Sequence, residues 1–236
     1  MTPLRGPVVV TGTDTGVGKT VVTAAVAAAA TSSSGLRVAV VKPCQTGVAL
    51  GEEPDADVVA RLAAPASSMT LLSYPDPLAP STAARVAGLP MLALGSVLGV
   101  VTSLAAQHDL VLIEGAGGLL VSLGSGDWTI ADLAVSLGAP AIVVARPELG
   151  TLNHTALTRE ALDERGVEHR LVLGSWPASP GLVHRTNLRD LPALSGVLPA
   201  GAGSLPPDEF QRAARGWLAA ELHGDWQAGS LATLAL

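Results

Sequence analysis

Cysteine and aromatic residues are scarce in this sequence. Cys44 is the one cysteine among 236 residues, so no intramolecular disulfide can form, and a reducing, cytoplasmic setting is expected. Aromatic residues make up only 3% of the chain, whereas apolar residues make up 48%. The core must therefore be built mainly from Ala, Val and Leu, a composition that suits a sheet buried between helices.

The sequence also lacks excess positive charge and uninterrupted apolar runs. The 14 Lys and Arg residues are scattered and outnumbered by 20 Asp and Glu residues, which argues against a nucleic-acid partner. Residues 1–7 show no signal-peptide pattern. Residues 86–108 contain no Asp, Glu, Lys or Arg, but Gly and Pro interrupt them and apolar residues recur at helical spacing. This segment predicts a buried amphipathic helix and no membrane span.

What the sequence does contain is an alternation of short β-branched runs and longer helical segments. This order indicates right-handed βαβ units, and hence an α/β fold whose mostly parallel sheet carries helices on both faces. Residues 65–90, rich in Pro and Ser, are expected to form an ordered excursion. We predict a single domain over residues 1–223 and a tail, 224–236, that is a candidate mobile segment. The predicted strands cover residues 8–11, 38–41, 110–113, 141–145 and 170–173, and the predicted helices include 19–30, 55–63, 151–165 and 207–222.

The most informative motif follows the first predicted strand. Residues 12–20 read Gly-Thr-Asp-Thr-Gly-Val-Gly-Lys-Thr and lead directly into a predicted helix. Glycines let backbone N–H groups fold around phosphate oxygens, and a helix N-terminus adds a favourable dipole for the same anion. As in a P-loop NTPase, Lys19 is expected to reach the β- and γ-phosphates and Thr20 to bind Mg²⁺. The predicted nucleotide-binding residues of this loop are Thr13, Asp14, Thr15, Gly16, Val17, Gly18, Lys19 and Thr20.

This loop departs from the standard pattern. Five residues, not four, separate Gly12 from Gly18, and Thr13 stands where the first glycine is expected. The loop also looks like the deviant phosphate loop of the partition-ATPase group, whose signature lysine corresponds to Asp14 here. Because that lysine usually acts on a neighbouring subunit's nucleotide, its absence weakens the partition-ATPase interpretation.

Charged residues near other strand ends are candidates to act on the same phosphates. Lys42 closes the second predicted strand and Glu114 the third, and the carboxyl ends of neighbouring parallel strands share one crevice. Glu114 is placed like a Mg²⁺-holding carboxylate, and the glycine-rich segment 115–118 would let a substrate approach the backbone. The acidic segment 52–57 is a second source of Mg²⁺ ligands, but spacing alone does not choose among Glu52, Glu53, Asp55 and Asp57.

A further helix start follows the fourth predicted strand. Its first N–H groups can hold an anion. His154 and Cys44 have no partner at the spacing of a metal site or a catalytic nucleophile, so they receive no role. The residues of this helix start are Gly150, Thr151, Leu152 and Asn153.

Residues 11–20, 42–47, 114–118 and 149–154 form four ordered motifs. Together they resemble the dethiobiotin synthetase family of biotin synthesis, over nearly all of the chain from Val8 to about Leu222. The resemblance implies that 7,8-diaminononanoate captures CO₂ as a carbamate, that ATP phosphorylates the carbamate, and that the second amine closes a cyclic urea as phosphate leaves. Because every intermediate is anionic, Lys19, Lys42 and Mg²⁺ are the groups that this chemistry needs.

The resemblance also implies individual roles. Thr20, Asp55 and Glu114 would hold Mg²⁺, and Asp55 is preferred over Asp57 because family members place this carboxylate six residues before an Arg, here Arg61. The family's helix start lies across a two-fold interface, which implies a homodimer with shared active sites. The implied substrate-binding residues are Thr13, Lys42, Thr46, Pro80, Ser81, Gly115, Ala116, Gly117, Gly118, Gly150, Thr151, Leu152 and Asn153.

One position departs from the pattern. Nucleotide-specific P-loop proteins often carry Asn after the fifth strand to read adenine, but residues 174–177 read Gly-Ser-Trp-Pro. We therefore expect triphosphate use with loose base selectivity, for ATP or another nucleoside triphosphate. The predicted base contacts are Gly174, Ser175, Pro199, Ala200 and Gly201.

Three other functions remain to be weighed against the synthetase. A partition-type ATPase switch lacks the signature lysine, a basic DNA patch and an amphipathic membrane tail. The synthetase portion of a cobyrinate amidase would need a glutaminase domain, which the remaining length cannot hold. A nucleotide-binding module without catalysis is the third alternative.

Overall fold

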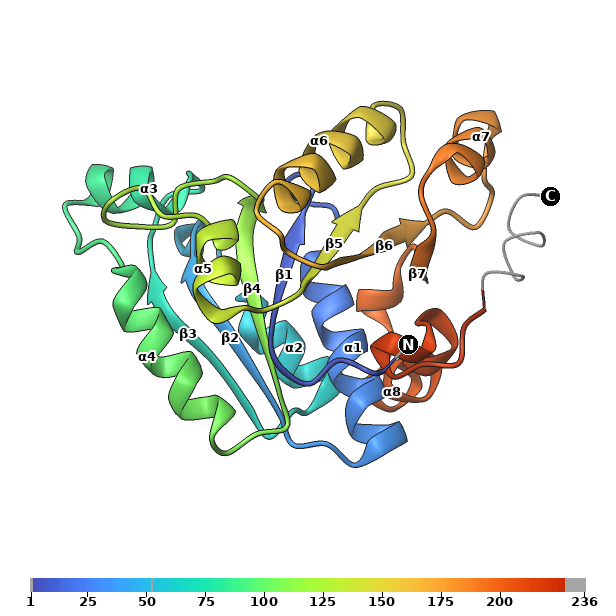
Figure 1. Cartoon of the computed structure of the whole chain (residues 1–236), viewed down its shortest axis with the longest axis horizontal. Coiled ribbons are helices and arrows are strands. Elements are labelled where there is room, and N and C mark those ends of the chain that lie inside the picture. Colours follow the sequence, from blue (N-terminus) through green and yellow to red (C-terminus); the bar gives the residue numbers. More distant parts are fainter. Residues whose placement is uncertain (1, 52, 228–236) are drawn as a thin grey trace.

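The computed structural model describes residues 2–51 and 53–227, in which seven strands form one sheet (Figure 1). Their order is β3-β2-β4-β1-β5-β6-β7, and every neighbouring pair is parallel. The α/β fold with a parallel sheet is therefore confirmed. The strands are β1 (Gly6–Gly12), β2 (Val38–Gln45), β3 (Ser67–Ser73), β4 (Leu110–Gly118), β5 (Ala141–Ala145), β6 (His169–Trp176) and β7 (Leu194–Pro199).

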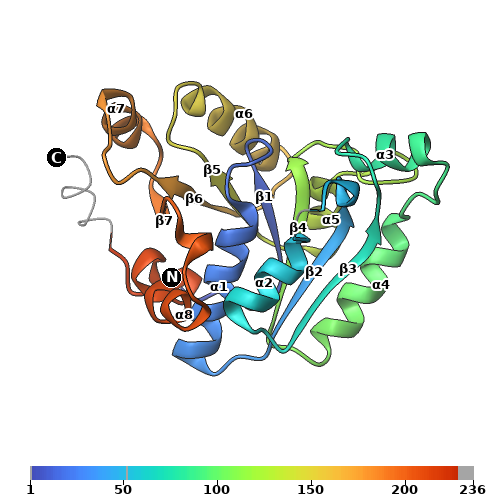
Figure 2. The same ribbon diagram turned by 180° about the vertical axis from the view of Figure 1, so that it is seen from behind.

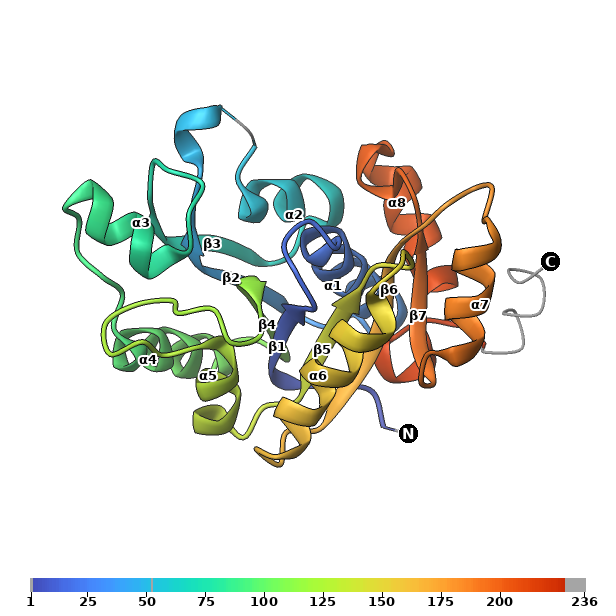
Figure 3. The ribbon, with the colours of Figure 1, turned by 90° about the horizontal axis from the view of Figure 1, so that it is seen from above.

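Helices cover both faces of this sheet, as expected (Figures 2 and 3). One core packs α1 (Lys19–Ser34), α2 (Asp55–Ala63) and α8 (Pro207–Ala214) against the sheet. Side chains alternate between the faces of a strand, so Val8 and Val10 enter this core while Val9 enters the other. The second core includes residues of α3 (Pro80–Ala87), α4 (Leu94–Ala105), α5 (Ile130–Leu137), α6 (Thr151–Asp163) and α7 (Leu182–Asp190).

The helix predicted within residues 86–108 is α4. It packs Val97 and Val101 against the sheet. In the described part of the chain, no helix combines the length and the apolar character that crossing a membrane would require.

Two strands were not predicted from the sequence, and each carries a weak signal. β3 lies inside the Pro- and Ser-rich excursion and is only half-buried because it forms the edge of the sheet. β7 contains Gly196 and ends in Pro199, both unusual within strands. The sequence also placed Lys42 at the end of its strand, but β2 continues to Gln45 because it pairs with β3 beyond its last contact with β4.

The predicted final helix, 207–222, is wrong in its second half. α8 ends at Ala214, and two 3₁₀ turns follow at Arg215–Trp217 and Ala220–Leu222. Between them, Leu218 forms an antiparallel bridge with Gly196, whose missing side chain lets the backbone of Trp217 approach closely.

The described start of the predicted tail is bonded to this segment. The N–H groups of Asp225 and Trp226 donate to the carbonyls of Arg215 and Leu218, both at 2.8 Å. Residues 228–236 of the tail lie outside the described residues.

Candidate active site

Three neighbouring strands end at one edge of the sheet and frame a cavity. β2, β4 and β1 are adjacent and parallel, so their carboxyl ends open on the same side. A cavity of about 600 Å³ lies there. It brings together many of the predicted site residues: Thr15, Gly16, Gly18, Lys19, Thr20, Lys42, Thr46, Asp55, Pro80, Glu114, Ala116 and Gly117.

The phosphate loop connects β1 to α1 through glycines in unusual conformations. Gly16 and Gly18 have φ angles of 72° and 94°, a left-handed conformation that glycine adopts without strain. Among the described residues, no side chain caps the start of α1, so its first N–H groups are available to an anion. Lys19 Nζ donates to the carbonyl of Asp14 at 2.9 Å, so the loop folds around its own lysine.

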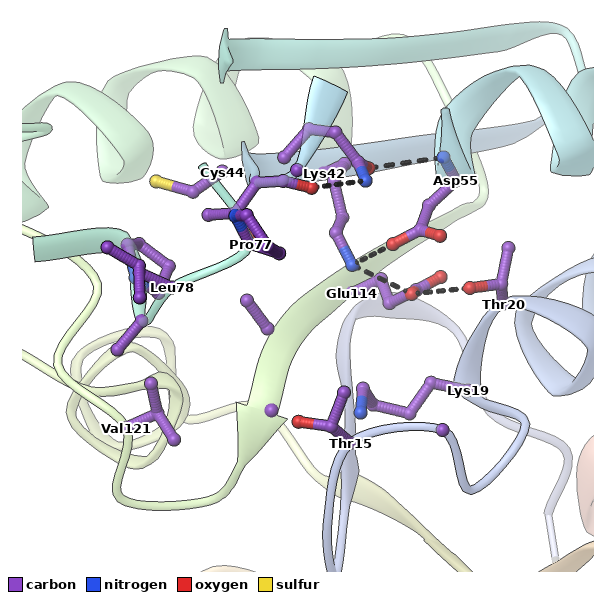
Figure 4. A pocket seen from close by; sticks show the side chains of 18 of the residues that line it. Thr15, Lys19, Thr20, Lys42, Cys44, Asp55, Pro77, Leu78, Glu114 and Val121 are labelled. Carbon is purple, nitrogen blue, oxygen red and sulfur yellow. Dashed lines mark hydrogen bonds and ion pairs between the residues drawn. The ribbon is translucent and has the colours of Figure 1, made fainter. Parts of the chain in front are cut away.

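Lys42 lies at the centre of a charged network beside this loop (Figure 4). Its ammonium group donates to Glu114 Oε1 at 2.9 Å and to the carbonyl of Gly115 at 3.0 Å, and it forms an ion pair with Asp55. The Thr20 hydroxyl donates to the same Glu114 oxygen at 2.9 Å. Lys42 and Glu114 are only 4% and 1% exposed. Charges this deeply buried are stable only when they are paired, so the network acts as one unit.

The protonation of these groups follows from burial and neighbouring charge. Burial and the charge of Lys42 lower the pKa of Lys19 to about 8. Burial also opposes the charged form of Lys42, but Glu114 and Asp55 outweigh it and raise the pKa of Lys42 above its ordinary value. Burial alone would raise the pKa of Asp55, yet the neighbouring charge of Lys42 and its contact with the carboxylate lower it.

The residues predicted to bind Mg²⁺ converge in this network. Glu114 and Asp55 meet at Lys42, and the Thr20 hydroxyl is bonded to Glu114, so all three contribute oxygen atoms to one place. Oxygen donors of this kind suit a hard divalent cation. Among the other acidic candidates, Asp57 is exposed, Glu53 pairs with Arg61 at the surface, and Glu52 lies outside the described residues. The geometry therefore favours Asp55 as the second carboxylate.

Sequence reasoning gave Gln45 no role, although it lies in the motif 42–47. Its Oε1 accepts the backbone N–H of Asp55 at 3.1 Å, and its Nε2 donates to the carbonyl of Thr46 at 3.3 Å. Gln45 thus links the end of β2 to the start of α2, which fixes the position of the Asp55 backbone and so of its carboxylate.

The far wall of the cavity is apolar and was mostly missed from sequence. Leu78 and Val121 lie on this side of the cavity, and Cys44 lies beyond Leu78 with its sulfur turned away from Lys42 (Figure 4). Burial raises the pKa of the Cys44 thiol to about 12, so it serves as an apolar surface and not as a nucleophile. The residues that sequence reasoning missed here, apart from Gln45, are Val21, Cys44, Gly47, Val48, Pro77, Leu78, Ala79 and Val121.

The predicted base contacts form a separate group outside this cavity. Gly174 and Ser175 lie just before Trp176, the last residue of β6, and the N–H of Ala200 donates to the carbonyl of Trp176 at 2.8 Å, which brings the ends of β6 and β7 together. Gly174 abuts the phosphate loop so closely that a Cβ atom would lie 2.0 Å from the carbonyl oxygen of Val17. Ser175, Pro199, Ala200 and Gly201 are exposed.

Other predicted residues also lie outside the cavity lining. Thr13, Asp14, Val17, Ser81, Gly115 and Gly118 flank it in sequence, whereas the start of α6 is a separate feature. At that start, Gly150 adopts a φ of 95° and Thr151 is buried, with no hydrogen-bond partner for its hydroxyl among the described residues. Asn187 of α7 donates to the carbonyls of Pro147 and Glu148 at 2.9 and 3.0 Å, which anchors the loop leading into α6.

Comparisons with known proteins cover nearly the whole chain. A family model described as an AAA domain matches residues 7–210. The ATP-dependent dethiobiotin synthetase BioD of Streptomyces avermitilis is 52% identical over 231 residues, which is 95% of this chain and 97% of that protein. The protein of the same name from Rhodococcus jostii is 55% identical over 215 residues, 89% of this chain and 93% of that protein. Likeness on this scale bears on the whole chain and not on one motif.

Solved structures show the same fold at low identity. The ParA family ATPase of Chlorobium tepidum has a TM-score of 0.54 and 12% identity, and covers 92% of this chain and 96% of its own. The septum site-determining protein MinD of Pyrococcus horikoshii, complexed with Mg-ADP, has a TM-score of 0.52 and 21% identity, with coverage of 100% and 95%. These likenesses establish a P-loop NTPase fold and say nothing of the reaction.

Proposed function

The chain belongs to the dethiobiotin synthetase family, an ATP-dependent ligase family, and we propose that it closes the cyclic urea of dethiobiotin from 7,8-diaminononanoate, CO₂ and a nucleoside triphosphate. One observation carries the proposal. Lys19 of the phosphate loop and Lys42 of β2 line one cavity, with the carboxylates of Asp55 and Glu114 between the strand ends and an apolar wall beyond. A triphosphate and an aliphatic diamine would each find a fitting half of this cavity.

One amine of the substrate attacks CO₂ and loses a proton to solvent, which gives the carbamate. The first of the two steps that follow is the transfer of a phosphoryl group to this carbamate. The carbamate oxygen attacks the γ-phosphorus, the bond to the bridging oxygen breaks, and the nucleoside diphosphate leaves with that electron pair. Lys19 would hold the transferred phosphoryl group and Lys42 the carbamate, because both reactants are anionic. Thr20, Asp55 and Glu114 would hold Mg²⁺, which supplies charge neutralisation on the phosphates when bound.

The second step closes the ring. The free amine attacks the carbonyl carbon of the carbamic–phosphoric anhydride, and inorganic phosphate leaves as the C–N bond forms. The reaction is intramolecular, so holding the two amines in place supplies much of the rate. Thr46 and the backbone beside Ala116 and Gly117 line the cavity near Lys42 and are the proposed positioning groups. The chemistry requires no protein nucleophile, which agrees with the inert state of Cys44.

The test is the dependence of phosphate release on both co-substrates. We expect purified protein to release phosphate from ATP only when diaminononanoate and bicarbonate are both present, with dethiobiotin formed in equal amount. Release that needs neither would support a partition-type switch. Nucleotide binding without release under any of these conditions would support a binding module.

We also propose that the active site is shared between two subunits. The substrate carboxylate lies roughly 8 to 9 Å from its amines, so it needs a second anion site. The start of α6 offers backbone N–H groups, and Leu149 and Leu152 beside it are 81% and 38% exposed, as expected of residues that a partner subunit covers. The cavity of the same chain is not lined by residues 150–153. This helix start is therefore free to bind a substrate held mainly by the partner subunit.

Mixed dimers test the sharing. Thr151 is buried, so the proposed carboxylate site is blocked at its exposed neighbours instead. The double variant Leu152→Asp/Asn153→Asp places negative charge where the substrate carboxylate would bind. This double variant and Lys19→Ala should each be inactive alone. Their mixture should regain part of the activity, because each heterodimer would contain one intact site. No recovery despite demonstrated subunit exchange would place the whole site within one chain.

A further inference from the structure

An acidic side chain stands in the phosphate loop, where triphosphate would bind. The carbonyl of Asp14 accepts the Lys19 ammonium at 2.9 Å, so the backbone of Asp14 lies within reach of the group expected to bind phosphate. Its carboxylate is half-exposed, and its Oδ1 accepts the backbone N–H of Thr15 at 2.7 Å. A carboxylate so near a triphosphate repels it unless a cation offsets its charge.

Arg146 supplies a cation at this position because of the register of the sheet. β1 and β5 are parallel neighbours, with Gly12 opposite Val144, and the N–H of Thr13 donates to the Val144 carbonyl at 2.9 Å. Asp14 and Arg146 each lie two residues beyond the pair Gly12 and Val144, so the same register places them side by side. The distance from Arg146 Nη2 to Asp14 Oδ2 is 3.8 Å.

The other cations at this site already have partners. Lys42 is bonded to Glu114 and Asp55, and Lys19 to the loop carbonyl. The chain contains only two lysines, and these are both of them. Arg146 is therefore the cation that forms an ion pair with the Asp14 carboxylate, while Lys19 adds an electrostatic attraction from within the loop. Arg146 is itself 38% exposed, so its effect on binding should be moderate and sensitive to salt.

We propose that Arg146 is a positioning residue of the phosphate loop, which neutralises Asp14 and holds its carboxylate away from the bound triphosphate. The inference rests on nucleotide binding by this loop, as the proposed function does, but not on the identity of the second substrate. Arg146 acts through Asp14 and not by contact with phosphate. Its loss should therefore matter only while position 14 is acidic.

A double-mutant cycle tests this dependence. The probe is a non-hydrolysable ATP analogue with Mg²⁺, and the readout is its Kd by calorimetry. Arg146→Met should raise the Kd about tenfold, as one uncompensated charge near a partly exposed site would. Arg146→Lys should restore binding. Asp14→Asn keeps the acceptor for the Thr15 N–H but removes the negative charge, so it should lower the Kd, and Asp14→Asn/Arg146→Met should bind like Asp14→Asn alone.

Two controls separate this role from others. Arg212→Met removes an exposed arginine that is paired with Asp208 at 3.0 Å away from the cavity, and should leave the Kd unchanged. The Arg146→Met defect should shrink as salt concentration rises. A defect of equal size with and without the Asp14→Asn change would show direct phosphate contact and overturn the proposal. So would an unchanged Kd in Arg146→Met, whatever its thermal stability. Because the assay needs no diaminononanoate, failure of the synthetase assignment would leave this result intact.

Discussion

The phosphate end of the cavity and the predicted base end differ in the kinds of groups that they present. At the phosphate end, Lys19, Lys42 and Glu114 are at most 7% exposed. Glu114 accepts hydrogen bonds from Lys42 and Thr20, and Lys19 donates to the carbonyl of Asp14. At the base end, the exposed residues Ser175 and Pro199–Gly201 offer backbone groups and one hydroxyl, and none of them is charged.

This difference indicates where the protein places its selectivity. Buried charges destabilise the fold unless each is paired, so they are arranged with little tolerance and recognise a fixed pattern of charge. An exposed edge of backbone fits many bases about equally well, because water competes for each hydrogen bond. The triphosphate should therefore be required strictly and the base only loosely.

The largest effect should come from removing charge at the phosphate end. Lys19→Ala deprives several developing negative charges of a fixed cation, and such groups contribute on the order of 3 kcal/mol to transition-state stabilisation. We expect product formation to fall by at least about a hundredfold. Thermal unfolding should confirm that the variant is folded. Near-normal turnover would show that this loop does not bind the reacting phosphates.

The two ends meet at Gly174, and a side chain there should disturb both. A Cβ atom at this position would lie 2.0 Å from the Val17 carbonyl oxygen and 2.8 Å from Val144 Cγ1, so the phosphate loop must shift. Gly174→Ala should weaken binding of an ATP analogue, because displacing the packed loop costs about 1 to 3 kcal/mol, the usual range for the loss of folding stability on overpacking. Gly99→Ala, in open space on α4, is the matched control and should bind normally. Equal binding by both variants would mean that the loop moves freely.

A smaller effect should follow when one carboxylate is made neutral. Asp55→Asn and Glu114→Gln each leave Lys42 with one charged partner and keep an oxygen donor in place. We expect each to raise the Mg²⁺ concentration needed for activity about tenfold. Mn²⁺ binding measured by electron paramagnetic resonance would check the site without turnover. Unchanged metal dependence in both variants would show that other residues hold the cation.

The sequence anticipated the phosphate end much better than its apolar wall. Lys19, Lys42 and Glu114 follow strands or loops of recognisable pattern, and parallel strands must bring their ends to one edge. Leu78 lies in the irregular segment after β3, an edge strand with little periodicity, and Val121 lies in the loop that follows β4. Gln45 could have been found only by knowing that β2 continues past Lys42 to reach α2.

At the base end, the comparison predicts weak discrimination. ATP, GTP and CTP should support activity within about tenfold of one another, because none of the predicted base contacts carries a side-chain amide. Ser175 is exposed, so Ser175→Asn can be accommodated where Gly174→Asn cannot, and it should favour ATP by several-fold. The measurement is kcat/KM for the three nucleotides in both proteins. A preference for ATP of about a thousandfold in the unaltered protein would need several well-placed hydrogen bonds and would contradict this description.

The smallest expected effect lies away from both ends and serves as their control. His223 is buried, and its Nε2 donates to the carbonyl of Leu4. Leu4 precedes β1, at the amino end of the strand and away from the phosphate loop. Its Nδ1 has no hydrogen-bond partner among the described residues, so a proton added there would find no acceptor. Burial accordingly lowers the pKa of His223 below its ordinary value of 6.5. The folded state favours the neutral ring, so its stability is complete above about pH 6.5 and falls as pH decreases toward the lowered pKa, by at most about 1.4 kcal/mol per pH unit.

His223→Asn removes the titration and tolerates the φ angle of 69° found there. Urea unfolding between pH 8 and pH 5 should show a shallower loss of stability in the variant than in the wild type, while the Kd for an ATP analogue stays the same in both. Parallel pH profiles would mean that His223 becomes protonated in the fold without penalty.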